Sequence, residues 1–130
     1  MIDAMAAALE ADPRIAYAVV FGSGAKGTAH PESDVDVAIG VVGARPLELI
    51  DLGALAARLE AIAGRRVDLV LLDEAPPGLA YRVFRDGRTI VARDKPALAR
   101  RRARAILEYL DFRPVEQLCA RGVLAAAHGR

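Results

Sequence analysis

The chain has 130 residues, 54% of them hydrophobic, and carries a net charge of +1 at pH 7. This length is enough for a single domain with a substantial core, and the near-zero net charge does not call for a nucleic-acid or membrane partner. We expect a cytoplasmic protein without a membrane span, because the sequence has neither a leader pattern nor an apolar run of about 18 residues. We expect no direct nucleic-acid binding, because the sequence has no tryptophan and does not interleave basic with aromatic residues.

Charge is distributed unevenly along the chain. Residues 1–92 carry a net charge of −4, whereas residues 93–130 carry a net charge of +5. We therefore divide the single predicted domain, residues 1–130, into a catalytic core (1–92) and a helical tail (93–130). Cys119 is the only cysteine, so no internal disulfide can form.

Apolar periodicity predicts the order helix, strand, loop, strand, helix and strand over the first half of the chain. Ile2, Met5 and Leu9 form the apolar stripe of the first helix. The second helix is expected to end at Gly64, because glycine accepts the left-handed conformation that closes a helix. The strands are predicted over 15–21, 33–39 and 66–72, and the second helix over 46–63.

The segment from 79 to 92 is ambiguous, since its alternating apolar residues also suit a hairpin that turns at Asp86-Gly87. We favour a short helix over 79–85 followed by a strand over 89–92, because turn signals on both sides bound one helical length. A helix from about 95 to 110 follows, and Pro114 is predicted to start a last helix.

The helix over 95–110 combines an apolar side with a cluster of arginines. We interpret the arginines as a solvated polar face, and docking of an acidic partner or of RNA phosphates is the alternative. The apolar side is formed by Ala99, Ala103, Ile106, Leu107 and Leu110, and the arginines are Arg100, Arg101, Arg102 and Arg104. The elements together predict an α/β (α+β) fold, in which a small mixed sheet has helices packed mainly on one side and a helical C-terminal tail.

Three aspartates lie in or beside apolar strands. Asp34 and Asp36 are two residues apart, so they point to the same side of their predicted strand. Asp68 is the single acid of a later strand. Carboxylates gathered on buried strands repel one another and resist desolvation, and a hard divalent cation such as Mg²⁺ relieves both effects. The alternative is that Asp34 and Asp36 face solvent and that Asp68 pairs with Arg65 or Arg66.

A glycine-rich loop follows the first strand and precedes the acidic one. Gly22 and Ser23 open a tight turn whose backbone N–H groups, at the start of a short helix, favour anions. Ser23 can donate a hydroxyl hydrogen bond to a phosphate, and Lys26 can supply a point charge. The alternative is that Ser23 is an ordinary helix cap and that the glycines are ordinary turn residues.

These residues, in the stretch FGSGAKGTAHPESDVDVAI, resemble the nucleotidyltransferase signature of the DNA polymerase β superfamily. The most similar members are the minimal nucleotidyltransferases, which include the MntA-type antitoxins that are paired with HEPN-domain toxins. The resemblance covers residues 15–72. The chain departs from the pattern at Gly24, where many relatives carry an arginine, so Lys26 is the basic residue of this loop.

The resemblance implies a nucleotidyltransferase fold and transfer of AMP from ATP to a hydroxyl group with the help of two Mg²⁺ ions. Two of the aspartates are implied to bind both ions, and the third completes the metal site and helps to activate the attacking hydroxyl. The implied nucleotide-binding residues are Gly22, Ser23 and Lys26, and the implied catalytic and metal-binding residues are Asp34, Asp36 and, as the third, Asp68.

The resemblance also implies a partner. The implied acceptor is a tyrosine of a HEPN-family toxin, so the chain is expected to act as an antitoxin and to form a hetero-oligomer. One alternative is an antitoxin that only binds the toxin through a degenerate site, which the missing arginine at Gly24 favours and the three retained aspartates disfavour. The other is an aminoglycoside-like nucleotidyltransferase, although the short chain leaves little room for an acceptor-holding domain.

Overall fold

The computed structural model describes residues 1–22, 34–44 and 47–120. Their strands form one mixed sheet in the order β3-β2-β1-β4. The central strand β1 pairs antiparallel with both neighbours, and β2 pairs parallel with β3. The strands are β1 (Ile15–Phe21), β2 (Val35–Val41), β3 (Val67–Leu71) and β4 (Arg88–Ala92).

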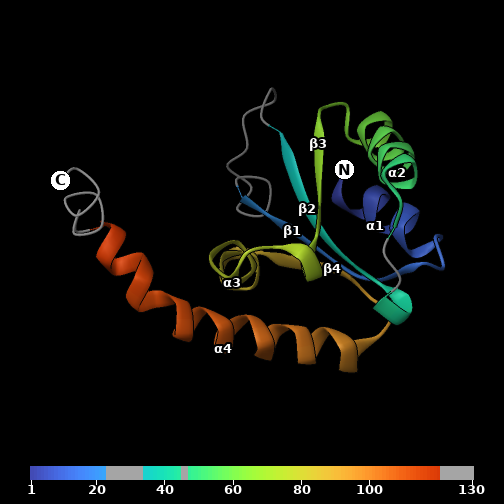
Figure 1. Cartoon of the computed structure of the whole chain (residues 1–130). Coiled ribbons are helices and arrows are strands. Elements are labelled where there is room, and N and C mark those ends of the chain that lie inside the picture. The colour runs from blue at the N-terminus through green and yellow to red at the C-terminus, as the bar shows by residue number, and fades with distance from the viewer. Residues whose placement is uncertain (23–33, 45–46, 121–130) are drawn as a thin grey trace.

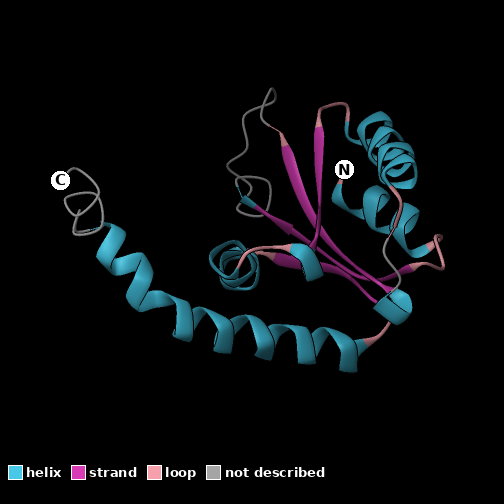
Figure 2. Cartoon of the chain, viewed as in Figure 1, coloured by secondary structure: helices cyan, strands magenta, loops and turns pink. Residues whose placement is uncertain are grey.

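Helices cover both faces of this sheet, as Figures 1 and 2 show. On one face, α1 and α2 pack against Ile15, Val37 and Ile39 in the larger core. On the other face, α3 and α4 pack against Tyr17, Val19 and Ala38. The helices are α1 (Ile2–Glu10), α2 (Leu49–Ala63), α3 (Pro77–Asp86) and α4 (Lys95–Ala120), with 3-10 turns at Val42–Ala44 and Leu72–Glu74.

The mixed α/β fold and its helical C-terminal segment are confirmed, but the placement of helices mainly on one side is wrong. The reason lies in β1, whose residues Ile15 to Val20 are all buried. Because neighbouring side chains of a strand point to opposite faces, a strand buried along its whole length needs cover on both sides. Two helices therefore lie on each face of the sheet.

Most element boundaries agree with the sequence. The first strand has the predicted bounds, and β2 begins two residues later than expected. Gly64 ends α2 in the left-handed conformation, with a φ of 70°. The ambiguous segment forms a helix followed by a strand, α3 and β4, and its edge strand β4 pairs with β1.

The last helix differs from the expectation in two ways. The first is that α4 continues through Pro114 as one helix of 26 residues instead of stopping before it. The second is its orientation, because the residues that face the sheet and α3 include Leu98, Arg101 and Ala105. Arg101 is therefore buried, contrary to the prediction of a solvated arginine face. The side predicted to be apolar points outward instead, leaving Ile106 41%, Leu107 63% and Leu110 50% exposed.

The long helix α4 extends past the sheet (Figure 1). A helix of this length reaches beyond a sheet whose strands have only five to seven residues. No helix among the described residues is both long and apolar enough to cross a membrane. We refer to Ile106, Leu107 and Leu110 as the outer stripe of α4.

Candidate active site

Two of the three predicted catalytic aspartates lie next to each other in the sheet. In the parallel pair of β2 and β3, Asp36 is the direct partner of Asp68, and on its other side Asp36 is opposite Phe21 of β1. Asp34 precedes β2 by one residue and is exposed. We call Gly22, Asp34, Asp36 and Asp68 the carboxylate end of the sheet, where β1 finishes and β2 and β3 begin.

Gly22 is part of this end because it touches Asp36. Its φ of +71° lies in the left-handed region, and a Cβ atom at this position would lie 2.7 Å from Asp36 Oδ2. Any other residue would therefore strain the backbone and displace the carboxylate. The first glycine of the predicted nucleotide loop thus brings its backbone against a predicted metal-binding carboxylate.

The electrostatics of the carboxylate end disfavour the charged form of Asp36. Partial burial raises the pKa of the Asp36 carboxyl, and the nearby carboxylates of Asp68 and then Asp34 raise it further. Asp36 forms no ion pair with any residue that the structure describes. A site whose carboxylates repel one another gains most from a bound cation, and its oxygen-only donors suit Mg²⁺.

Asp68 has a basic neighbour, as the alternative interpretation of the sequence proposed. Arg66 Nε lies 3.7 Å from Asp68 Oδ1, but the two side chains are 73% and 46% exposed. An exposed pair at this separation contributes little stability and leaves the carboxylate available to a ligand. In the described part of the chain, no group of three or more His, Cys, Asp or Glu side chains is close enough to hold a metal ion.

Ser23 and Lys26 lie outside the described residues, as does Gly24. The described part of the predicted site is therefore Gly22, Asp34, Asp36 and Asp68. The roles of all these residues stay predictions.

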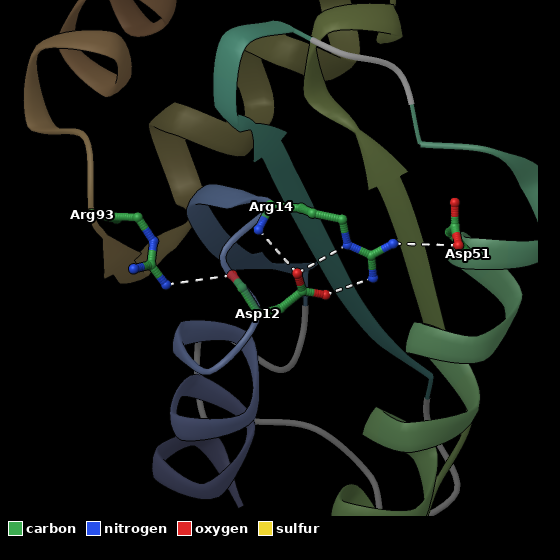
Figure 3. Close-up of polar contacts among 4 residues, drawn as sticks. All are labelled: Asp12, Arg14, Asp51 and Arg93. Atoms are coloured by element: carbon green, nitrogen blue, oxygen red, sulfur yellow. Dashed lines mark hydrogen bonds and ion pairs between the residues drawn. The ribbon is translucent and has the colours of Figure 1, made fainter.

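The opposite end of the sheet holds a group of charged residues that the sequence did not predict as a unit. Figure 3 shows Arg14 between Asp12 and Asp51, with Nη2 at 2.7 Å from Asp12 and Nη1 at 3.3 Å from Asp51. Arg93 donates from Nε to the Ile15 carbonyl at 2.9 Å and from Nη2 to the carbonyls of Glu10 and Asp12. These contacts tie the end of β4 to the turn between α1 and β1.

The first half of α4 adds more arginines at this same end. Arg101 Nε and Arg104 Nη2 each lie 3.5 Å from Asp73 Oδ1, just beyond the end of β3. We call Asp12, Arg14, Asp73, Arg93, Arg101 and Arg104 the arginine end of the sheet. The spacing of Leu98, Arg101 and Ala105 at intervals of three and four was the signal that could have revealed the buried arginine.

Residues 4–96 match the family described as "Polymerase beta, Nucleotidyltransferase", and this region contains the whole carboxylate end. The chain belongs to the polymerase β nucleotidyltransferase family. A search of curated protein sequences found no match.

Solved structures agree with the family assignment. A toxin–antitoxin crystal structure with AMP-PNP aligns with 95% of this chain and 99% of its own at a TM-score of 0.79 and 24% identity. An MNT antitoxin in complex with a tri-AMPylated HEPN toxin, from Shewanella oneidensis, aligns with 95% and 99% at a TM-score of 0.74 and 21% identity. At this level of identity, the two likenesses show a shared nucleotidyltransferase fold.

A third likeness has a higher sequence identity over a shorter region. A chain described as a minimal nucleotidyltransferase is 31% identical and aligns with 66% of this chain and 86% of its own at a TM-score of 0.56. The family match and these three structures agree on the nucleotidyltransferase domain.

Proposed function

We propose that this protein is an antitoxin that transfers AMP from ATP to a hydroxyl group of a HEPN-family toxin, a tyrosine in the favoured case. The observation that carries the proposal is the carboxylate end, where Asp36 lies against Gly22 and beside Asp68 in a nucleotidyltransferase fold. The AMP-PNP complex and the AMPylated toxin of the structural relatives support AMP as the transferred group.

The proposed reaction is a displacement at the α-phosphorus of ATP. The acceptor oxygen bonds to this phosphorus, the bond to the β-phosphate oxygen breaks, and pyrophosphate leaves with the bonding electrons. Asp68 accepts the hydroxyl proton, while Gly22, with Ser23 and Lys26, positions the triphosphate. Asp34, Asp36 and Asp68 would hold Mg²⁺, and the bound ions would supply positive charge that lowers the hydroxyl pKa and stabilises the phosphate oxygens.

The outer stripe of α4 supports a protein partner for this reaction. Leu107 is 63% exposed and Leu110 50% exposed on α4. An exposed group of large aliphatic side chains is typical of a surface that another protein covers. We assign this surface to the HEPN-family toxin, because the structural relatives that share this fold over 95% of the chain come from toxin–antitoxin complexes.

The proposal is tested by the intact mass of a HEPN-family partner after incubation with this protein, ATP and Mg²⁺. We expect the partner to gain one or more AMP units. The gain in mass should disappear with the Asp34→Asn/Asp36→Asn double variant. It should persist with Asp3→Asn, which makes the same change at an exposed position of α1. Full transfer by the double variant would refute the proposed metal site.

A binding-only antitoxin is the second candidate, favoured by Gly24, which stands where many relatives carry an arginine. Tight co-purification with the partner and no mass gain would support it. Transfer to a small-molecule hydroxyl, without modification of the partner, would instead support the aminoglycoside-like alternative.

The assignment of the outer stripe is tested separately. Leu107→Glu should weaken association with the toxin by at least about 10-fold, because it places a charge in a surface that complex formation desolvates. Thermal stability should stay unchanged, since Leu107 is already 63% exposed. Ala99→Glu, another exposed position of α4, is the control for added charge. Unchanged affinity of Leu107→Glu, measured by calorimetry, would remove the outer stripe from the interface.

A further inference from the structure

A cavity of about 480 Å³ lies at the arginine end, away from the carboxylate end. It is bounded by the first residues of β1, by Val41 at the end of β2 with Val42 and Gly43 of the turn that follows, and by the first half of α4. This volume falls within the range of about 300–1,000 Å³ that small-molecule sites occupy. Its polar lining consists of Tyr17, Asp73, Asp94, Arg100, Arg101 and Arg104.

Arg101 is the buried group of this lining, with a side chain only 4% exposed. Its Nη2 donates to the Leu72 carbonyl at 2.8 Å. Its Nε and Nη1 donate no hydrogen bond to any residue that the structure describes. The nearest carboxylate, Asp73, lies 3.5 Å from Nε and is shared with Arg104. A buried guanidinium with two unused nitrogens needs an acceptor, because burial removes the water that would otherwise satisfy it.

The other charges of the lining leave positive charge in excess. Three arginines face two aspartates, so the formal charge of the lining is +1. Asp94 Oδ1 already accepts a hydrogen bond from the Ala97 N–H at 3.0 Å, at the start of α4. Arg100 forms no ion pair within the described chain. Burial lowers the pKa of Arg101, and repulsion from Arg104 lowers it further, so an added anion would offset both effects.

We propose that this cavity binds a phosphate-type oxyanion, either free or as the phosphate of a small molecule, independently of the carboxylate end. The unused N–H groups of Arg101 match the several acceptor lone pairs of such an anion, and guanidinium groups bind phosphate through paired hydrogen bonds. Arg100 supplies charge at the exposed rim. Neither residue takes part in the proposed transfer, so this inference does not depend on the proposed function.

Isothermal titration calorimetry with inorganic phosphate, pyrophosphate and AMP tests the proposal. The titrations use the Asp34→Asn/Asp36→Asn protein without Mg²⁺, so that binding at the carboxylate end does not interfere. We expect saturable binding of at least one of the three anions. Equal affinity for phosphate and AMP would indicate that the free anion is the ligand, and tighter binding of AMP would indicate a phosphate-bearing small molecule.

Three arginine variants locate the binding. Arg101→Met and Arg100→Gln should each weaken binding by about 10-fold, because each removes one charge-assisted contact. Arg102→Gln is the matched control, since Arg102 is the next residue of the same helix, is exposed and does not line the cavity. If Arg101→Met fails to fold, the anion affinity of Arg100→Gln, a change at an exposed position, tests the proposal by itself. Absence of binding by all three anions, or equal affinities of the Arg100→Gln and Arg102→Gln proteins, would overturn the proposal.

Discussion

The two ends of the sheet shift the pKa of an aspartate in opposite directions. At the arginine end, hydrogen bonds from Arg14 lower the pKa of Asp12. At the carboxylate end, burial and the neighbouring carboxylates raise the pKa of Asp36. The difference arises because Asp12 has Arg14 at 2.7 Å, whereas Asp36 forms no ion pair with a described residue and lies beside Asp68.

This contrast distinguishes charged side chains that stabilise the fold by pairing with each other from charged side chains that lack such a partner and are available to a ligand. Asp12 and Arg14 satisfy each other and link the turn after α1 to α2 through Asp51. The carboxylate of Asp36 costs stability in the absence of a cation, and such unpaired charge is typical of functional sites. The arginine end itself contains one exception, Arg101, which is why its cavity is a candidate binding site.

The largest predicted effect is the loss of transfer on changing Asp36 to Asn. We expect at least a 100-fold lower rate, about the scale for removing one electrostatic contact to a transition state. Stability should not fall at pH 7, because the raised pKa means that the charged carboxylate is disfavoured in the folded state. A rate assay together with urea unfolding measures both.

The Asp36→Asn variant also tests the direction in which folding stability changes with pH. The folded-state pKa of Asp36 is raised, so its contribution to stability falls as pH rises from about 4 through the raised value. Asp36→Asn should lack this decline. The difference in unfolding free energy between wild type and Asp36→Asn, measured across this pH range, separates the contribution of Asp36 from those of the other carboxylates. A variant that becomes less stable than wild type with rising pH would contradict the assignment of Asp36 as an unpaired carboxylate.

Gly22→Ala should have the next largest effect, because its Cβ would meet Asp36 Oδ2 at 2.7 Å and its φ is +71°. We expect a loss of more than about 2 kcal/mol in unfolding free energy, with a large loss of transfer. Gly64→Ala is the matched control, since Gly64 has a φ of +70° and the Cβ of an alanine there would meet nothing within 4 Å. That variant should lose only about 1 kcal/mol and keep its activity. Equal losses in the two proteins would show that contact with Asp36 is unimportant.

Arg93→Met should destabilise the arginine end by about 1–3 kcal/mol, because it leaves backbone carbonyls without their charged donor. The carbonyl of Ile15 loses its partner at 2.9 Å, and those of Glu10 and Asp12 lose theirs as well. Arg82→Met, at an exposed position of α3, provides the control. Urea unfolding of the two variants would separate them, and equal midpoints would show that the Arg93 contacts contribute nothing.

The smallest effect is expected from Arg14→Gln, with a loss of less than about 1 kcal/mol at neutral pH, because Arg14 is exposed. The lowered pKa of Asp12 means that its pair with Arg14 stabilises the fold above about pH 4 and that this contribution disappears as pH falls through the folded-state pKa. Acid unfolding of Arg14→Gln should therefore be less steep below pH 4 than that of wild type. Parallel acid-unfolding curves would contradict the role of this pair.

Local sequence patterns were enough to predict the strands and the positions of Asp34, Asp36 and Asp68 in or beside them. β1 follows from its uninterrupted run of apolar residues, and the alternation of Asp36 with Val35 and Val37 predicts which side of β2 the carboxylate occupies. The parallel pairing of Asp36 with Asp68 needed the arrangement of β2 beside β3, which the periodicity of single strands does not contain. The ion pair of Asp68 with Arg66 was left open by the sequence and is present in the structure.

The last helix shows where local patterns fail. Its sequence places aliphatic residues on one side, so the burial of Arg101 and the exposure of Leu107 contradict amphipathicity alone. The second face of the sheet decided this orientation, since α4 packs against α3 and β1 with its small residues and Arg101 reaches the Leu72 carbonyl. A helix that also forms part of a binding surface can leave its most apolar side exposed in the isolated chain.

The sequence by itself determined the strands and the first three helices, the glycine that follows β1 and the placement of three aspartates in or beside strands. These features depend on backbone preferences and on the periods of a helix and a strand. Only the tertiary structure decided that Gly22 touches Asp36, that helices cover both faces, and that arginines gather around a cavity at the opposite end. These features depend on strand order and helix packing, which bring together residues far apart in the chain.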